Sequence, residues 1–449
     1  MTNDRFDHWL DKHPEIDNVR AFVCDLNGIL RGKRVPVEKI PGIIAGELRM
    51  PLSIAGADIW GEDIKNSQLV LETGDSDGVC QFTGRGILPV SWTQKPSAML
   101  PLWLAKEDGT PFDADPRRAL AGVLERFKRL GLTPVVAIEL EFYLFDSANG
   151  APEPAKPPLS GGRRQADSVL SLDDLDQFES FLNDVYAACK LQAIALDAAV
   201  SENGAGQFEI NMKHVADPLR AADDAILFKH LVRGIARKHG LGATFMAKPY
   251  GNKAGNGLHV HFSLLDANGQ NIFDDGTDQG SDIMRHAVAG LLETMAALSL
   301  SFAPHINSYR RLTPGSLAPS AIAWGYENRT SAIRIPGGSN EARRIEHRVA
   351  GADANPYLVL ASVLGGALLG MNKKLDAPKP VSGNAYRLDL EHLPDDWGTA
   401  IAAFAQDKGV ADIYSRQLIE MFCAAKSQEL ARFARNVTAM EYDAYLEMV

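Results

Sequence analysis

The sequence predicts a protein of two domains that contains both helices and strands. Short strand-like runs separated by glycine and proline turns fill the first hundred residues, whereas helical patterns appear among the strands from residue 111 onward. The chain of 449 residues is also longer than a typical single domain. We therefore expect a small domain over residues 1–110 and a larger one over residues 111–449.

Hairpins dominate the expected N-terminal domain. In VRAFVCDLNGILRGKRVPV, Asn27-Gly28 lies between two apolar runs, and Asn-Gly is strongly preferred in two-residue hairpin turns. Asp108-Gly109 occupies the same place in PLWLAKEDGTPF, which predicts a second hairpin.

Helices are expected mainly in the larger domain. One begins at Pro116, after the capping residue Asp115, and ends at Gly131. PYLVLASVLGGALLGM is short for a membrane span and rich in small residues, so it predicts a buried helix. SANGAPEPAKPPLSGGRRQADS predicts a loop. Further helices are predicted in SLDDLDQFESFLNDVYAACKLQ, in DPLRAADDAILFKHLVRGIARKHG and from about Ser415 onward.

Composition disfavours several classes of partner. The formal net charge of −11 argues against binding to nucleic acid or to an acidic membrane surface. The N-terminal stretch is acidic and lacks the apolar segment of a secretory signal, and the four cysteines are far apart. We therefore expect a cytoplasmic enzyme or assembly whose cysteines are reduced.

Two carboxylates lie on one face of the expected strand VVAIELEFYLF, residues 135–145. Its β-branched and aromatic residues predict a buried strand, and residues two apart on a strand share a face. Glu139 and Glu141 therefore lie side by side among apolar neighbours. Because an unpaired buried charge is costly, another group must compensate these two.

Other predicted strands carry polar residues in the same way. LHVHFSL has His259 and His261 on one face, and RRIEHR has Arg344, Glu346 and Arg348. Taken singly, such residues are more often solvated or are satisfied parts of a core. Together they indicate one shared site. VSENGAGQFEINM and ENRTSAIRIP add Glu202, Glu209, Arg329 and Arg334.

The residue types of this shared site indicate its chemistry. Several glutamates with histidine and no cysteine suit a hard divalent cation, Mg²⁺ or Mn²⁺. The arginines suit an anionic ligand, because a guanidinium group presents two donors to a carboxylate or a phosphate. Metal ions, arginines and acids together are typical of phosphoryl transfer, although the chain has no P-loop motif.

The chain resembles the glutamine synthetase family over nearly its full length. The segments CDLNGILRGKRVP, FMAKP and WGYENRT are more similar to the γ-glutamylpolyamine synthetase branch than to true glutamine synthetases. The stretches that carry the family resemblance are IELEFYLF, ENGAGQFEIN, FMAKPYGNKAGNGLHVHFSL, NSYRRLTPG, ENRTSAIRIP and ARRIEHRVAGADANPYLVLASVLGGALLG.

The resemblance implies an α+β fold, the glutamine synthetase fold. A small β-grasp-like N-terminal domain would precede a large catalytic domain with a curved antiparallel sheet and helices. The resemblance also implies a homododecamer of two hexameric rings, in which the N-terminal domain of one subunit closes the active site of the next. The substrates would be ATP, glutamate and an amine, with two to three Mg²⁺ or Mn²⁺ ions at each site.

The resemblance also assigns two sets of metal ligands. The ion near glutamate would be bound by Glu141, Glu202 and Glu209. The ion among the phosphates would be bound by Glu139, His259 and Glu346.

The remaining roles concern the substrates. Arg311 and Arg348 would hold glutamate or its reacting γ-carboxyl group. Gly255 belongs to the glutamate-binding loop, but Ala254 replaces the asparagine that usually precedes it. The residues on ATP, its phosphates and the transferred phosphoryl group would be His261, Arg329, Arg334 and Arg344.

Leu317 in TPGSLAP bears on the acceptor. It stands where true glutamine synthetases carry a glutamate that binds ammonium and takes its proton. A leucine offers no anionic partner to ammonium, but it can pack against a methylene chain, which contributes roughly 0.8 kcal/mol per buried CH₂. Asp58 in AGADIWGEDI is the expected second acid of the amine site, with Glu62 and Asp63 as alternatives.

We therefore expect an ATP-dependent glutamate–amine ligase that forms γ-glutamyl phosphate and transfers the acyl group to putrescine, a polyamine or another alkylamine. The alternatives are a true glutamine synthetase that uses ammonia and a non-catalytic structural homologue. A diamine would need a second acid at some distance from its reacting nitrogen. Glu327 is a candidate, although Glu327 also suits a structural pairing with Arg329. A monoamine would need no such acid.

Overall fold

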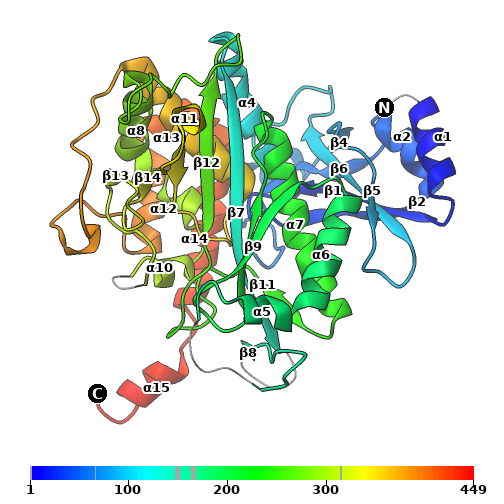
Figure 1. Cartoon of the computed structure of the whole chain (residues 1–449). Helices are drawn as coiled ribbons and strands as arrows, with labels where there is room; N and C mark the ends of the chain where they lie inside the picture. Colours follow the sequence, from blue (N-terminus) through cyan, green and yellow to red (C-terminus); the bar gives the residue numbers. More distant parts are fainter. Residues whose placement is uncertain (1–2, 66, 147–151, 163–167, 314–315) are drawn as a thin grey trace.

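The computed structural model describes residues 3–65, 67–146, 152–162, 168–313 and 316–449. Within these ranges, two β-sheets and the helices around them form an α+β fold, as predicted (Figure 1). Parts of the predicted loop, 147–151 and 163–167, lie outside the described residues, as do Pro314 and Gly315 of TPGSLAP.

The first sheet is formed by the N-terminal part of the chain, at one side of the molecule (Figure 1). Its strand order is β2-β1-β6-β4-β3, with β5 beside β6, and β1 runs parallel to β6. β1 and β2 form the predicted antiparallel hairpin, and Gly28 in its turn has a φ of 75°, a conformation that favours glycine. The strands are β1 (Asn18–Cys24), β2 (Leu30–Pro36), β3 (Arg49–Pro51), β4 (Asp77–Phe82), β5 (Leu88–Val90) and β6 (Ser97–Ala105).

The turn at Asp108-Gly109 is also present. The backbone N–H of Lys106 donates to the carbonyl oxygen of Thr110 at 2.8 Å, and Ala105 bridges to Pro111. The chain then enters α4 (Pro116–Arg129) and the second sheet. The division into domains at residue 110 stays a prediction.

The second sheet carries the predicted site. Its order is β13-β14-β15-β12-β7-β10-β9, with β8 and β11 also beside β7. Neighbouring strands run antiparallel, except that β13 and β14 run parallel. Residues 327–332 lead from the end of β13 back to the start of β14, so that both strands run in the same direction. The strands are β7 (Thr133–Asp146), β8 (Glu153–Pro154), β9 (Leu196–Ser201), β10 (Gln207–Met212), β11 (Gly242–Thr244), β12 (Leu258–Leu265), β13 (Trp324–Tyr326), β14 (Ile333–Ile335) and β15 (Ile345–His347).

The central strand β7 has two different faces. Ile138, Leu140 and Phe142 are fully buried on one face, whereas Glu139 and Glu141 lie on the other. The apolar face anchors the strand in the core, which leaves the acidic face to the site. The ring of Phe142 lies 5.5–6.3 Å, between centroids, from the rings of Phe181, Phe208, Phe228 and Phe245.

Helices cover the apolar side of this sheet. α4 (Pro116–Arg129) and α7 (Pro218–Lys238) pack against β7, and α11 (Pro356–Lys373) packs against both of them and against α8 (Asp282–Met295). The predicted cap is confirmed, because the Asp115 carboxylate accepts hydrogen bonds from two backbone N–H groups of α4. α11 is buried nearly throughout, as predicted for its apolar sequence. No helix in the described ranges is long and apolar enough to cross a membrane.

A segment that was predicted to form one helix forms two. SLDDLDQFESFLNDVYAACKLQ forms α5 (Leu172–Gln177) and α6 (Glu179–Leu191), separated at Phe178. The Phe178 ring is buried and packs edge-to-face against Phe208 at 5.2 Å, so the tertiary contact interrupts the helix.

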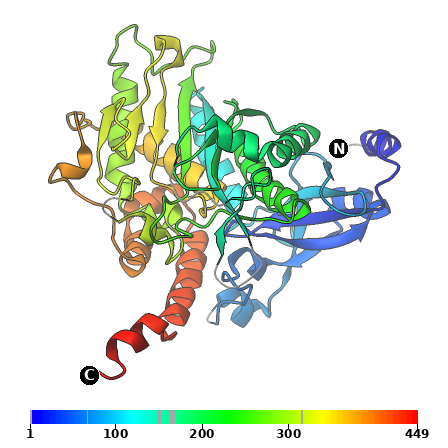
Figure 2. The ribbon, with the colours of Figure 1, turned by 60° about the horizontal axis from the view of Figure 1, so that its bottom comes forward.

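The C-terminal segment leaves the body of the molecule. α14 (Arg416–Ala434) begins where predicted, and α15 (Ala439–Tyr445), red in Figure 2, extends away from the rest. The four cysteines are buried and unpaired. The remaining helices are α1 (Asn3–Lys12), α2 (Ile40–Ile44), α3 (Gln68–Thr73), α9 (Ser299–Phe302), α10 (Ser308–Arg311), α12 (Trp397–Gln406) and α13 (Lys408–Ile413).

The close approach of α8 and α11 gives a test of the packing. A Cβ at Gly290 would lie 2.2 Å from the oxygen of Gly366 and 2.5 Å from the nitrogen of Gly370, both backbone atoms. We expect Gly290→Ala to lower the free energy of unfolding by about 1–3 kcal/mol, because the helices must move apart. Calorimetry would then record a lower unfolding midpoint.

Gly122→Ala on α4 is the matched control. No described atom lies within 4 Å of the Cβ that it adds, so it should stabilise the helix by about 0.5–1 kcal/mol. Equal unfolding midpoints for the two variants would contradict the close helix contact.

Candidate active site

The pairing of β10, β7 and β12 brings predicted acids and a histidine together. Glu139 of β7 lies opposite His259 of β12 on one side and opposite Asn211 of β10 on the other. Glu141 lies opposite Glu209 of β10. The polar face is therefore assembled across strands that are distant in the sequence.

The pairing continues on the other side of β12. His261 lies opposite Glu346 of β15, which lies opposite Arg334 of β14. Acids thus predominate toward β10, and arginines appear toward β14.

Glu141, Glu202 and Glu209 form an acidic cluster in which one oxygen of each lies within 4.8 Å of the others. The N–H of Glu202 donates to the Gln207 oxygen at 2.9 Å, which fixes the turn after β9, and the N–H of Gly257 donates to Oε2 of Glu141 at 2.5 Å. Burial, together with neighbouring carboxylates, raises the pKa of Glu202 to about 7 and that of Glu209 to about 9. The protein alone therefore leaves the charge of this cluster only partly balanced.

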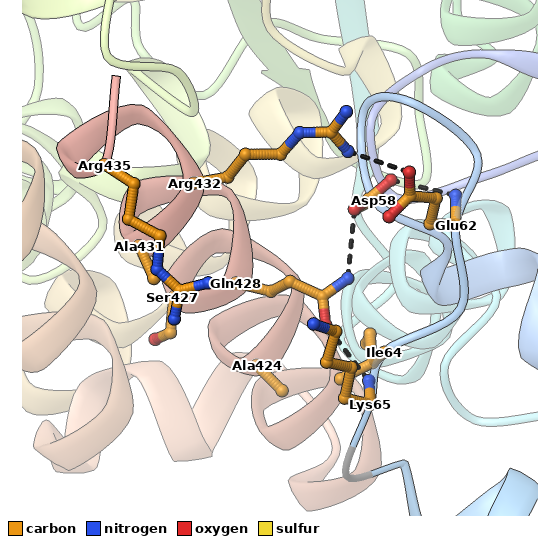
Figure 3. A pocket seen from close by; sticks show the side chains of 10 residues that line it. All are labelled: Asp58, Glu62, Ile64, Lys65, Ala424, Ser427, Gln428, Ala431, Arg432 and Arg435. Atoms are coloured by element: carbon orange, nitrogen blue, oxygen red, sulfur yellow. Dashed lines mark hydrogen bonds and ion pairs between the residues drawn. The ribbon is translucent and has the colours of Figure 1, made fainter. Parts of the chain in front are cut away.

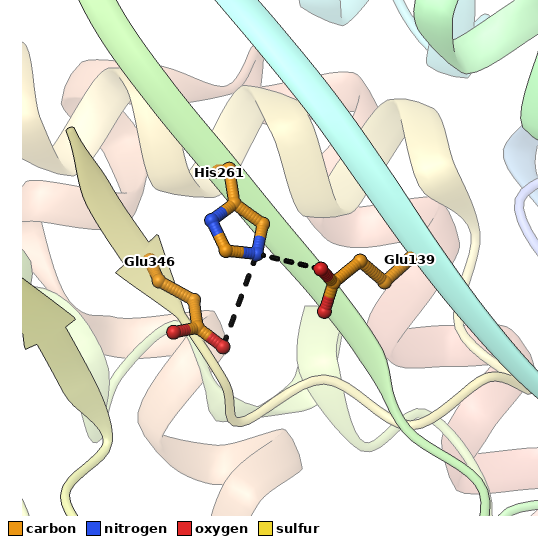
Figure 4. Close-up of side chains that lie close together, drawn as sticks. All are labelled: Glu139, His261 and Glu346. Atoms are coloured by element: carbon orange, nitrogen blue, oxygen red, sulfur yellow. Dashed lines mark ion pairs between the residues drawn. The ribbon is translucent and has the colours of Figure 1, made fainter. Parts of the chain in front are cut away.

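Glu139 belongs to two further groups of potential metal ligands, one with His261 and Glu346 and the other with Glu209 and His259. Its Oε1 lies 3.0 Å from Nε2 of His261, and its Oε2 lies 3.2 Å from Nδ1 of His259. Figure 4 shows the His261 ring between Glu139 and Glu346. Burial disfavours the charged form of Glu139, but the two imidazoles outweigh it and lower the pKa of this carboxyl.

The two histidines differ in which ring nitrogen faces the glutamates. Nδ1 of His261 accepts a hydrogen bond from Nε of Arg344 at 3.3 Å, and Nε2 of the same ring faces Glu139 at 3.0 Å. Nδ1 of His259 faces both Glu139 and Glu209, at 3.2 and 3.9 Å. Each histidine thus directs one ring nitrogen at Glu139, and each belongs to one of the two groups of potential metal ligands.

Glu346 is held between two arginines. Its Oε2 accepts from Nη1 of Arg334 at 2.7 Å, and its Oε1 accepts from Nη1 of Arg348. Burial favours the neutral form, but these charges and the nearby histidines outweigh it and lower the pKa of Glu346. Glu346 is therefore an ionised carboxylate at neutral pH.

A cavity of about 740 Å³ opens on this face of the sheet. Arg311 is buried beside it and donates from Nη1 to the Val349 oxygen at 2.7 Å. A Cβ at Gly255 would lie 2.6 Å from the Ala247 oxygen and 2.9 Å from Cγ of Arg311, so glycine permits this approach. The predicted site residues that line the cavity are Glu139, Glu141, Glu202, Glu209, Gly255, His259, His261, Arg311, Leu317, Arg329, Arg334, Arg344, Glu346 and Arg348.

Asp58 lies elsewhere, in a pocket of about 600 Å³ between its own loop and α14 (Figure 3). Its Oδ1 accepts from the N–H groups of Trp60 and Glu62, at 3.0 and 2.9 Å. Its Oδ2 accepts from Nε2 of Gln428 at 3.0 Å. Glu62, the alternative acid, pairs with Arg432 at 2.8 Å in the same pocket. Within one chain, Asp58 therefore does not join the residues that line the cavity.

Leu317 and Glu327 are placed differently. Leu317 is exposed at the cavity and has a φ of 66°. Glu327 accepts from the N–H of Gly337 and lies 3.4 Å from Arg334, and it is not among the described residues that line the cavity. The structural interpretation of Glu327 is thus favoured, with Arg334 rather than Arg329 as its partner.

The cavity also contains residues that the sequence did not assign to the site, among them Val169, Leu170 and Tyr386. Burial raises the pKa of Tyr386, and the charges of Arg348 and Arg311 oppose that shift. The available signal for Val169 and Leu170 was their apolar character directly after a polar, glycine-rich loop.

Comparison with known proteins identifies the class. Residues 113–445 match the family described as the catalytic domain of glutamine synthetase. The chain belongs to the glutamine synthetase family, and its fold is the glutamine synthetase fold. It is an ATP-dependent carbon–nitrogen ligase rather than a non-catalytic homologue.

Individual relatives include amine ligases. The chain is 38% identical to gamma-glutamylputrescine synthetase PuuA of Escherichia coli, with 97% of this chain and 93% of that protein covered. It is 30% identical to glutamate–isopropylamine ligase of a Pseudomonas species, with 98% and 97% covered. The solved structure of apo GmaS without ligand has a TM-score of 0.84 and 27% identity, covering 98% of each chain.

The donor groups fit the ATP and divalent metal that this family uses. Carboxylate oxygens and one imidazole nitrogen are suitable ligands for a hard cation. The raised pKa values of Glu202 and Glu209 show that added positive charge would be favourable beside them.

Metal binding should therefore displace protons. We expect the affinity for Mn²⁺ to increase as the pH rises from about 6 to about 8, because Glu202 and Glu209 must lose protons to bind it. Calorimetric titrations in buffers of different ionisation enthalpy would measure the number of protons released.

Glu202→Gln should reduce both the affinity and the proton release. Glu38→Gln, at an exposed acid of the N-terminal part, should change neither. Metal binding that is independent of pH and releases no protons would contradict the assignment of the acidic cluster.

Proposed function

We propose that the chain joins the γ-carboxyl group of glutamate to an alkylamine at the expense of ATP, with putrescine or another polyamine as the leading acceptor class. The observation that supports this acceptor is Leu317, an exposed apolar side chain at the cavity. By resemblance, a true glutamine synthetase would have a glutamate here. The names of two relatives, which specify putrescine and isopropylamine, agree with an alkylamine acceptor.

The reaction has two chemical steps. A γ-carboxylate oxygen of glutamate first attacks the terminal phosphorus of ATP, the bond to ADP breaks, and γ-glutamyl phosphate forms. The amine first loses a proton, its nitrogen lone pair then attacks the acyl carbon, and phosphate leaves with the second proton of that nitrogen. ATP, glutamate and the protonated amine thus give the amide, ADP, phosphate and a proton.

The arginines are assigned to the charged groups in these steps. Arg311 and Arg348 would hold glutamate and its γ-carboxyl group, and Arg329 would face the transferred phosphoryl group. Arg334 and Arg344 would bind the nucleotide phosphates, beside His261. Fixed donors of this kind stabilise charge that develops in the transition state without reorganising.

The metal ligands remain those that the family implies. Glu141, Glu202 and Glu209 would hold one ion, and Glu139, His259 and Glu346 a second, of two to three Mg²⁺ or Mn²⁺ ions per site. When bound, these ions supply positive charge that polarises phosphoryl and carboxyl oxygens.

The proposed active site is completed by an adjacent subunit. A dodecamer of two hexameric rings would bring Asp58 of an adjacent copy toward the cavity, where it would receive the amine. The loop that holds Asp58 lies at the molecular surface, next to α14, which is compatible with such a role. Unpaired cysteines support a reducing, cytoplasmic location.

An amine panel tests the acceptor. We expect kcat/KM for putrescine to exceed that for ammonia, and Leu317→Glu to shift the ratio toward ammonia by about tenfold or more. The reason is that a hydrogen bond to a charged group contributes about 1.5–3 kcal/mol. Phosphate release and product mass would be measured with ATP and glutamate saturating.

Leu317→Gln is the matched neutral control and should not produce this shift. A wild-type enzyme with its highest kcat/KM for ammonia would overturn the proposed acceptor and favour a true glutamine synthetase.

The neighbouring glutamates of β7 should have separable roles. We expect Glu139→Ala chiefly to raise KM for ATP, and Glu141→Ala chiefly to slow formation of the γ-glutamyl phosphate. Losses of about 10- to 100-fold are expected, as when metal coordination is disturbed. Steady-state KM values and single-turnover ADP formation would measure the two effects. The same kinetic defect in both variants would refute the division of roles.

A further inference from the structure

The cavity has apolar walls as well as charged ones. Val169 and Leu170 contribute apolar surface to the wall of the cavity, as do Leu317, Ala318 and Pro319. The side chains of Val169, Leu170 and Leu317 are 52%, 67% and 60% exposed. Large, partly exposed apolar side chains that line a polar cavity indicate a ligand with an apolar part.

Backbone hydrogen bonding fixes the position of Leu170. Its φ of 58° is in the left-handed region, which leucine seldom adopts. Its N–H donates to the oxygen of Ser201 at 2.8 Å, and the Ser201 hydroxyl donates to the oxygen of Ser168 at 3.3 Å. The segment is thus attached to the end of β9 on both sides of Val169. Strained residues of this kind persist where the surrounding structure fixes them, often at ligand sites.

Leu317 shares this unusual conformation. Among the described residues, the leucines with a positive φ are Leu170 and Leu317, and both line the same cavity. Both side chains lie at the cavity and are more than half exposed.

The position of Leu170 connects this wall to the reacting groups. Ser201, its hydrogen-bond partner, directly precedes Glu202 of the acidic cluster. Val169 and Leu170 are therefore tied to the segment that carries Glu202, and all three residues line the same cavity.

We propose that Val169 and Leu170 bind the methylene chain of the acceptor amine and set the preference for its length. This inference rests on the proposed function, since it requires an alkylamine acceptor. The ligand class is a primary amine with several consecutive methylene groups. Each methylene covered by the wall should raise kcat/KM about fourfold.

The test is the dependence of kcat/KM on chain length. For the full-length wild-type enzyme, pentylamine should exceed ethylamine by about 60-fold if all three added methylenes are covered. Val169→Thr and Leu170→Asn remove apolar surface, and asparagine tolerates a positive φ. In the double variant, the ratio should fall to about tenfold or less, as measured by phosphate release with ATP and glutamate saturating.

Leu172→Asn is the control. Leu172 is 75% exposed, lies two residues further along, and is not among the described residues that line the cavity. This variant should keep the wild-type ratio. Unfolding midpoints of all variants would be compared with that of the wild type.

The outcomes separate the two proposals. If the wild type prefers ammonia, the proposed function itself is wrong. If the wild type prefers long alkylamines and the double variant keeps the same ratio, the proposed function stands and the role of Val169 and Leu170 is refuted. A uniform loss for every amine, with an unchanged ratio, would show a structural role and would equally refute it.

Discussion

Carboxylates crowd one face of the central sheet because β7 and β10 pair in a register that sets Glu141 directly opposite Glu209. Like charges in this position destabilise a sheet, and burial makes the repulsion stronger. The apolar face of β7 holds the strand in place in spite of this, through Phe142 and the aromatic rings around it. Anything that supplies positive charge to the acidic face therefore stabilises the folded protein as it binds.

The protein's own side chains supply positive charge to the site unevenly. Toward β14, Glu346 is satisfied by Arg334 and Arg348, and its pKa is lowered despite burial. Toward β10, the charges of Glu202 and Glu209 are not balanced in this way, and their pKa values are raised. One end of the site thus suits cations and the other suits anions, as a reaction between a nucleotide and a carboxylic acid requires.

The sequence predicted those features that depend on residues close to one another along the chain. The alternation of β7 placed Glu139 and Glu141 on one face, and the capping residue Asp115 located the start of α4, because both patterns are local. Fourteen of the fifteen predicted site residues line one cavity, and Asp58 is the exception.

The rest depended on contacts between distant segments. The pairing of His261 with Glu346 follows from strand register, which periodicity does not specify. Phe178 divides a helical pattern because it packs against Phe208 on another element. Leu170 lines the cavity while its backbone is hydrogen-bonded to Ser201, a residue of β9 that local sequence does not point to.

The loop of Asp58 depends on a helix far along the chain. The N–H of Ile59 donates to Glu429 at 2.9 Å, and Gln428 contacts Asp58 across a separation of 370 residues. During synthesis, the loop therefore leaves the ribosome long before its supporting side chains exist. The N-terminal sheet can form early from its own hairpins, but this loop reaches its final shape only once α14 has been made and has docked.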